Sequence, residues 1–494
     1  MTPDFDDTTT PADAHCYRAL TARDARFDGI FFTGVSSTGI YCRPVCPART
    51  PRAEMCRFFS SAAAAEQAGF RPCLRCRPEL APYALQQNLA YAVWQRIAAG
   101  ALNHHDEGSG IEALAATVGL SSRQLRRVLL QHFGVTPVGL AQTQRLLFAK
   151  KLLQETTLPM TALAHAAGFG SVRRFNALFA ARYGIAPGAI RRSAGEHRDG
   201  DALVLRLAYR PPLAWTTMLT YLAGRSMPGL ETVDAGAYLR SVQLDGASGW
   251  LRVTHLPLKN QLQLEIAPAL ADVLMPLLAR VRSQFDLDAN PTLIDRHLAQ
   301  DPLLAAQITR LPGLRVPGCF DVFELAVRAV LGQQISVAGA TTLSGRLVAR
   351  FGALAATPFA SIQRHFPSAD LLAATPVEAI AGLGMPRSRA ATIRAVAQFA
   401  VQGGLAIPPG QALAPTISAL RSVHGIGEWT AQYIALRALR FPDAFPAGDL
   451  GLQKAAAPQR LTEAQLLVRA GDWAPWRAYA ALRLWQSLRD DADS

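Results

Sequence analysis

Four cysteines in two close pairs could bind a metal ion. Three residues separate Cys42 from Cys46, two separate Cys73 from Cys76, and 26 residues lie between the pairs. Such spacing suits a tetrahedral Zn²⁺ held by four thiolates. The alternative is four unrelated buried cysteines. The sequence therefore predicts one zinc ion with Cys42, Cys46, Cys73 and Cys76 as its ligands.

A second chemical pattern lies near the C-terminal end of the chain. Gly425 and Gly427 permit a tight hairpin between two predicted helices. Such a hairpin aims backbone N–H groups at one point, which suits a phosphate. In the next Gly- and Pro-containing loop, Asp449 is the lone acid. Its carboxylate could stabilise a developing cation, and the alternatives are a helix N-cap or a surface acid.

The cysteine motifs Thr38–Cys46 and Gly69–Pro78 resemble the metal-binding domain of the Ada DNA-repair regulators, over about residues 12–82. The resemblance implies that a cysteine takes a methyl group from a methyl phosphotriester of the DNA backbone, and that Cys42 is the acceptor. Because a thioether is not readily cleaved, the transfer would be stoichiometric. Loss of one thiolate charge would strengthen binding to phosphates. The alternative is a zinc ion that only folds the module.

Helical periodicity follows in residues 85–198, with 13 Lys and Arg against 5 Asp and Glu. Helices are predicted over Ile111–Ala115, Arg123–Phe133, Met160–Ala167 and Val172–Tyr183. The second and last of these end in Gly-x-x-Pro. The two helix-turn-helix units resemble those of AraC-type transcription regulators, over about residues 85–195.

The second helix of each helix-turn-helix unit would enter a major groove of DNA. There, Arg can read guanine, Gln or Asn can read adenine, and Ser can contact phosphate. For any single arginine, the alternative is a solvated surface charge. The predicted DNA contacts are Ser122, Arg123, Gln124, Arg126 and Arg127 in the first unit and Ser171, Arg173, Arg174 and Asn176 in the second.

The C-terminal half resembles AlkA-type 3-methyladenine DNA glycosylases of the helix-hairpin-helix superfamily, over roughly residues 205–488. The matching motifs are Tyr209–Pro212, Leu331–Val337 and Pro475–Ala480, with the hairpin and its aspartate. The resemblance implies extrusion of an N-alkylated purine and hydrolysis of its glycosidic bond, with Asp449 as the catalytic carboxylate. It assigns Tyr221, Trp429, Tyr433 and Trp485 to the base pocket and Gln334, Gly425 and Gly427 to DNA contact. For each aromatic residue, core packing is the alternative.

Some features depart from these families. Lyase-active relatives carry a lysine at the position of Trp429, so strand cleavage by that route is not expected. Cys319 is the one cysteine after residue 76, so no iron–sulfur cluster is expected. Gly448 and Leu450 flank Asp449 where relatives often carry an acid and an aromatic residue. The Pro-Cys-His-Arg motif of a guanine methyltransferase domain is absent.

The elements that must position these residues follow from patterning along the 494 residues. Residues 205–265 alternate apolar and polar side chains, as strands do, and helical patterns return over 268–488. We predict a multidomain protein, mainly α with α+β parts. Its domains are a flexible tail (1–11), an Ada-type zinc-binding methyl-acceptor domain (12–84), an AraC-type double helix-turn-helix domain (85–198), an AlkA-type N-terminal α+β domain with an antiparallel sheet (205–315) and an all-α helix-hairpin-helix glycosylase domain (316–488).

The charge balance agrees with a polyanionic partner. The net charge is +13 and the isoelectric point is near 9.8. We expect alkylated and promoter double-stranded DNA as partners, RNA polymerase as a further partner, no membrane, a monomer and a reducing cytoplasm. The alternatives are a transcription regulator with a catalytically silent C-terminal half, and a glycosylase whose N-terminal half only tethers it to DNA.

Overall fold

The computed structural model describes residues 13–82, 89–103, 107–193, 202–407, 411–456 and 459–492. The predicted tail 1–11 lies outside the described residues, as do residues 199–201 between two of the predicted domains. The chain forms two compact units, residues 1–210 with 257–279, and residues 211–256 with 280–494. Each unit contains one group of the predicted functional residues.

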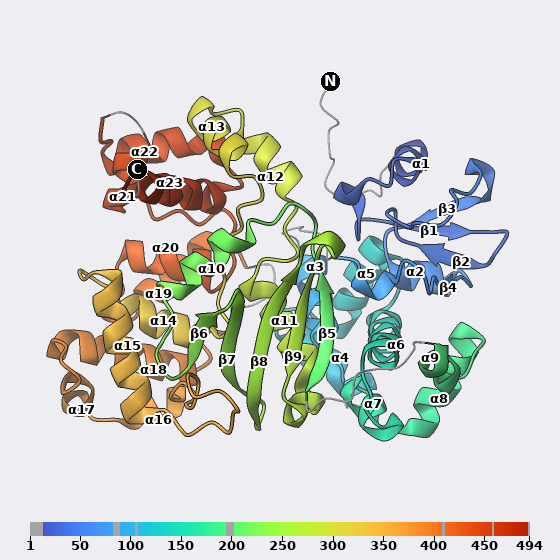
Figure 1. The fold of residues 1–494 in the computed structure, drawn as a ribbon, viewed down its shortest axis with the longest axis horizontal. Helices are drawn as coiled ribbons and strands as arrows, with labels where there is room; N and C mark the ends of the chain where they lie inside the picture. Colours follow the sequence, from blue (N-terminus) through green and yellow to red (C-terminus); the bar gives the residue numbers. More distant parts are fainter. Residues whose placement is uncertain are drawn as a thin grey trace. The chain divides into compact units, whose positions relative to one another are not determined.

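The first unit opens with a small α+β module, drawn in blue in Figure 1. Its elements are α1 (Asp13–Thr21), β1 (Phe32–Val35), β2 (Ile40–Cys42), β3 (Cys56–Phe59), α2 (Ala62–Gln67) and β4 (Arg71–Pro72). The strand order is β3-β1-β2-β4. Strands β2 and β4 run parallel, with Tyr41 opposite Pro72. Both cysteine pairs therefore begin at the same end of this sheet.

Helices make up the next part of the first unit. They are α3 (Leu89–Ala98), α4 (Glu107–Ala116), α5 (Ser122–Phe133), α6 (Pro137–Glu155), α7 (Met160–Ala166), α8 (Val172–Tyr183) and α9 (Pro187–Ser193). The Ser121 and Ser171 side chains cap α5 and α8, and Gly134 and Gly184 end them at φ 71° and 69°. The helices predicted over Arg123–Phe133, Met160–Ala167 and Val172–Tyr183 are confirmed to within one residue at each end. The helix predicted over Ile111–Ala115 is longer, because α4 begins at Glu107.

The region predicted as strands, 205–265, is only partly strand. In the first unit, β5 (Leu203–Ala208) pairs antiparallel with β9 (Gln261–Ile266). In the second unit, β6 (Glu231–Asp234), β7 (Ala237–Leu244) and β8 (Ala247–Leu256) form an antiparallel meander. The prediction was wrong over α10 (Trp215–Ala223), where buried residues recur at helical spacing.

The second unit is otherwise helical, as predicted. Helix α11 (Leu274–Gln284) runs across the boundary between the units. The helices that follow it are α12 (Pro291–Leu298), α13 (Pro302–Arg310), α14 (Val322–Leu331), α15 (Val337–Phe351), α16 (Ala369–Ala374), α17 (Val377–Ala381), α18 (Arg387–Val401), α19 (Leu413–Arg421), α20 (Glu428–Arg437), α21 (Leu450–Ala455), α22 (Glu463–Arg469) and α23 (Arg477–Ala492). Helix α14 packs on α18 and α20, and α21 packs on α23. Within the described ranges, no helix is both long and apolar enough to cross a lipid bilayer.

Candidate functional sites

The four predicted cysteine ligands lie together in the first unit. Their sulfur atoms are all within 4.8 Å of one another. Cys46, Cys73 and Cys76 are buried, whereas Cys42 is partly exposed. Backbone N–H groups point at the cluster, since the Arg43 amide lies 3.4 Å from the Cys76 Sγ. Four convergent sulfurs suit Zn²⁺, which prefers tetrahedral thiolate coordination.

A buried ion pair supports the cysteine cluster. The Arg43 guanidinium donates to the Asp28 carboxylate, with Nε 2.8 Å from Oδ1, and its Nη1 donates to the Cys76 carbonyl at 3.1 Å. Both side chains are nearly buried. The guanidinium is therefore held between the Asp28 carboxylate and the backbone of the ligand Cys76. The sequence analysis did not identify this pair, because an isolated Asp in a turn has no distinguishing pattern.

Buried acids connect the cysteine module to the helices that follow it at two places, and Glu66 makes the first connection. Glu66 of α2 accepts hydrogen bonds from the Tyr41 hydroxyl at 3.0 Å and the Thr143 hydroxyl at 2.9 Å, and lies 3.4 Å from Arg182 of α8. Burial raises the pKa of Glu66 to about 7, although Arg182 and both hydroxyls oppose the shift. Tyr41, the residue before Cys42, is thus joined through Glu66 to a helix of the second helix-turn-helix unit.

Lys150 of α6 makes the second connection. Its ammonium group is fully buried, donates to the Cys73 carbonyl at 3.3 Å and pairs with Glu79 at 2.7 Å. Arg77 pairs with the same Glu79 and with Glu155 at the end of α6. A buried charge stays ionised only where partners compensate its desolvation. This network therefore ties the geometry of the second cysteine pair to α6.

The predicted DNA-contacting residues lie on the exposed faces of α5 and α8. Both helices repeat one burial pattern, with Leu125 and Phe175 buried at equivalent positions and the polar residues around them exposed. Arg123, Arg126, Arg127, Arg173, Arg174 and Asn176 are exposed, and Ser122 is half-buried. Gln124 and Ser171 also cap their helices through side-chain oxygens. The cap engages the Gln124 carbonyl oxygen and leaves its amide nitrogen outside the cap, and the DNA contacts of both helices stay predictions.

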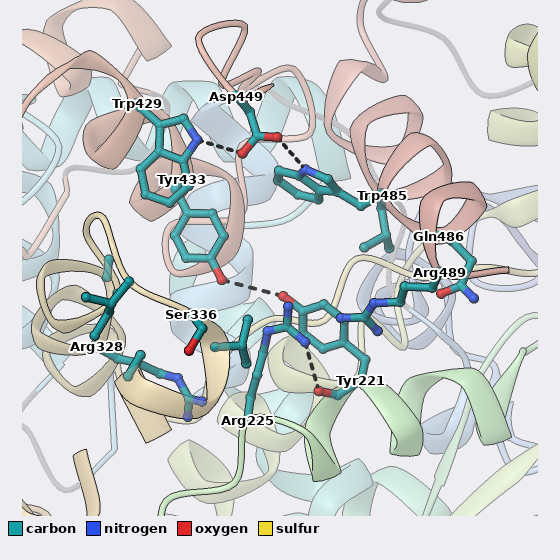
Figure 2. A pocket seen from close by; sticks show the side chains of 16 residues that line it. Tyr221, Arg225, Arg328, Ser336, Trp429, Tyr433, Asp449, Trp485, Gln486 and Arg489 are labelled. Carbon is teal, nitrogen blue, oxygen red and sulfur yellow. Dashed lines mark hydrogen bonds between the residues drawn. The ribbon is translucent and has the colours of Figure 1, made fainter. Parts of the chain in front are cut away.

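The second unit holds a cavity of about 400 Å³ whose wall includes Asp449 and all four predicted pocket aromatics (Figure 2). Asp449 is the N-cap of α21, because its Oδ1 accepts from the Leu452 amide at 3.0 Å. The Trp429 and Trp485 indole N–H groups also donate to this carboxylate, at 2.9 and 3.0 Å. Three N–H groups therefore converge on one carboxylate and fix its orientation at the cavity wall. Asp449 is therefore both a helix N-cap, which was one of the alternatives for this acid, and a residue of the cavity wall.

The aromatic residues come from three helices. Trp429 and Tyr433, one turn apart on α20, stack with ring centroids 5.2 Å apart and planes 9° apart. Trp485 of α23 meets Tyr433 edge-on at 6.3 Å. Tyr221 of α10 places its hydroxyl 3.5 Å from that of Tyr433. The cavity therefore has flat ring surfaces beside an anion, which suits a planar cationic base.

Arginine side chains, which the sequence analysis missed, surround Tyr221. The guanidinium of Arg225 lies 3.9 Å from the ring centroid, and those of Arg437 and Arg489 lie at 4.9 and 5.2 Å. Burial alone would raise the pKa of Tyr221, but the charges of Arg437 and Arg225 outweigh burial and lower that pKa to about 7. For Tyr433, burial and the nearby Tyr221 oxygen raise the pKa.

The hairpin residues lie where the sequence predicts. Gly425 has φ 85°, and a Cβ there would meet the Thr392 hydroxyl at 2.0 Å, so no larger residue fits. Gly427 is the residue before α20. Gln333 anchors the hairpin by donating to the Gly425 carbonyl at 3.0 Å. The adjacent Gln334 is exposed at φ 56°, and its predicted DNA contact stays a prediction.

Comparison with known proteins identifies four family matches along the chain. They are the metal-binding domain of Ada (residues 15–79), a helix-turn-helix domain (114–193), the AlkA N-terminal domain (204–321) and the HhH-GPD superfamily of base excision DNA repair proteins (327–466). These matches confirm the predicted resemblances, and the Ada match together with the sulfur cluster confirms the zinc-binding site.

Relatives match at different lengths. A probable bifunctional transcriptional activator/DNA repair enzyme AlkA of Mycobacterium tuberculosis is 39% identical over 481 residues, 96% of each chain. The DNA-3-methyladenine glycosylase 2 of Escherichia coli is 36% identical over 283 residues, 56% of this chain and 95% of its own. A solved 3-methyladenine DNA-glycosylase from Archaeoglobus fulgidus has the same fold, with TM-score 0.51 and 21% identity over 57% of this chain and 98% of its own.

Proposed function

The chain belongs to the family of bifunctional transcriptional activator/DNA repair proteins, and from this premise we propose that it senses alkylated DNA, regulates transcription and excises alkylated purines. The proposed bases are N-alkylated purines such as 3-methyladenine, removed by hydrolysis of the N-glycosidic bond. The observation that carries the proposal is the Asp449 carboxylate, held by two indoles at the wall of an aromatic cavity. The regulatory activity implies promoter DNA and RNA polymerase as partners.

In the proposed excision, the bond between C1′ of the deoxyribose and the purine nitrogen breaks, and the base leaves with the bonding electron pair. An N-alkylated purine is cationic before it leaves and neutral afterwards, so it needs no added proton. Positive charge develops on the sugar, where the Asp449 carboxylate stabilises it. A water molecule then adds to C1′ and loses one proton, which Asp449 is placed to accept.

In the proposed methyl transfer, the Cys42 sulfur attacks the methyl carbon of a methyl phosphotriester. The S–CH₃ bond forms as the O–CH₃ bond breaks, and the phosphate oxygen keeps the electron pair. Cys42 is the most exposed of the four ligands, which favours it as the acceptor. A bound zinc ion would keep the thiols deprotonated. The Arg43 amide donates to the Cys76 Sγ and its guanidinium donates to the Cys76 carbonyl, so Arg43 positions that ligand.

One incubation with methylated double-stranded DNA tests both activities in the full zinc-loaded chain. Chromatography measures freed 3-methyladenine, and intact-protein mass spectrometry measures a gain of one CH₂. The Cys42→Ser variant should release base at the wild-type rate without gaining mass, and Asp449→Asn should gain mass without releasing base. A wild-type protein that does neither contradicts the proposal, and a labelled methyl group on Cys42→Ser contradicts the acceptor.

A further inference from the structure

Arg437 is a buried cation without a carboxylate partner. Its side chain is 4% exposed. Nε donates to the Pro317 carbonyl and Nη2 to the Gly318 carbonyl at 3.1 Å. Its remaining group, Nη1, donates to the Tyr221 and Tyr433 hydroxyls at 2.6 and 2.7 Å. Across the part of the chain that the structure describes, Arg437 forms no ion pair with an acid. Because a buried charge without a counter-charge is costly, an ionised phenol at this position would stabilise the Arg437 guanidinium.

The two phenols are arranged to share one charge. Their oxygens are 3.5 Å apart and accept from the same Arg437 nitrogen. If one phenol is ionised, its oxygen can accept from Arg437 and from the other hydroxyl at once. If both were ionised, two anions would lie side by side, which like-charge repulsion disfavours. The lowered pKa of Tyr221 and the raised pKa of Tyr433 agree with one shared charge.

The same arginines pose a problem for a cationic base. Arg225 and Arg489 line the cavity beside Tyr221, and Arg437 lies directly behind the two hydroxyls. With both phenols neutral, Arg225 and Arg437 would face a bound base from the tyrosine side, and Asp449 is the one acid among the described residues that line the cavity. A cationic purine would then meet net repulsion on the tyrosine side. A phenolate there would remove that repulsion.

We propose that Tyr221 and Tyr433 share one phenolate charge that pairs with Arg437 and, with Asp449, selects cationic purines over neutral ones. This selectivity rests on the proposed glycosylase function, whereas the phenolate itself does not. A neutral purine gains nothing from the second anion. The tyrosine pair therefore acts as a specificity determinant, separate from the carboxylate that serves the sugar.

Charged groups from every neighbouring element act on the pair. Arg225 of α10, Arg437 of α20 and Arg489 of α23 favour the phenolate. Arg328 of α14 adds positive charge, which Glu231 of β6 offsets from 3.6 Å. Glu324 of α14 is paired with Arg240, Cys319 is a buried thiol whose pKa is raised to about 12 by burial, and Asp449 faces the pair across the cavity. Among the described residues, the charges of Arg437 and Arg225 therefore act most strongly in favour of the phenolate.

Ultraviolet difference spectroscopy of the full zinc-loaded chain tests the phenolate directly. We expect about one of the ten tyrosines to ionise near pH 7 in the wild type. The Tyr221→Phe/Tyr433→Phe double variant should lose that transition. The matched control Tyr479→Phe should keep it, because the buried Tyr479 has a pKa raised well above its usual value. Absence of tyrosinate below about pH 9 in the wild type, or an unchanged transition in the double variant, overturns the proposal.

Base release tests the selectivity. The readout is kcat/KM for 3-methyladenine, which is a cation in DNA, divided by kcat/KM for the neutral purine hypoxanthine. This ratio should rise roughly tenfold between about pH 6 and 8. The double variant should show a low ratio that does not change with pH. A wild-type ratio independent of pH overturns the selectivity. Release of neither base overturns the proposed function and the selectivity together, while the tyrosinate transition decides the phenolate separately.

Discussion

The cysteine cluster of the first unit and the carboxylate cavity of the second stabilise anions in different ways. The four sulfurs come from two short loops within 35 residues, joined by the parallel pairing of β2 and β4. The single carboxylate of Asp449 instead takes three N–H donors from α20, α21 and α23. A metal centre is thus specified by short spacing, whereas a hydrogen-bonded anion needs a packed core to bring its donors together.

Removal of one sulfur ligand should have the largest effect. Cys73→Ser should lose nearly all bound zinc, because structural zinc sites contribute on the order of 10 kcal/mol to folding of their modules. Metal analysis and calorimetry of the full chain measure this loss. Cys56→Ser, which lies outside the sulfur cluster, should keep its zinc. Full zinc content in Cys73→Ser would contradict the assignment of Cys73 as a zinc ligand.

Neutralising the carboxylate should affect rate rather than stability. We expect Asp449→Asn to slow release of 3-methyladenine roughly 1000-fold, since it removes the charge that stabilises the sugar cation. The melting temperature should change little, because Asn is also a good N-cap for α21. Single-turnover base release measures the effect, and Asp472→Asn, at an exposed acid, is the control. An unchanged rate would mean that the three donors serve only the fold.

The buried Glu66 makes the stability of the first unit depend on pH. The pKa of Glu66 is raised to about 7. The protonated side chain therefore contributes to the free energy of unfolding at low pH, and this contribution is lost as the pH rises through 7. Relative to Glu66→Gln, the wild type should lose up to about 3 kcal/mol between about pH 5 and 8. Urea unfolding of both proteins at each pH measures this difference, with the exposed Glu54→Gln as control. A difference that does not vary with pH would show that Glu66 stays ionised.

Loss of a single indole donor should have the smallest effect. Trp485→Phe keeps a ring in the cavity but removes one N–H bond to Asp449, which is worth about 2 kcal/mol for a charged acceptor. The rate of base release should fall by between tenfold and a hundredfold. Trp476→Phe, a tryptophan outside the cavity lining, should leave the rate unchanged. Equal effects of the two substitutions would show that ring packing, rather than the donor, matters.

Local patterns were sufficient for the parts of the molecule that depend on neighbours in sequence. The cysteine spacing, the Gly425 hairpin and the ends of α8 were predicted, because loop closure, turn geometry and helix caps act over a few residues. The region around α10 was predicted less well. Its flanking strands alternate clearly, and the short helix between them shows its buried face only once packed.

The amino-acid sequence alone determined the four sulfur ligands, the acid of the cavity loop and the order of the modules. The tertiary structure decided which charges meet. Glu66 with Arg182, and Arg437 with Tyr221, lie far apart in the chain and have no distinctive spacing. Burial makes such pairs important, since desolvation strengthens each charge interaction and shifts its pKa, and burial is established only when distant helices pack.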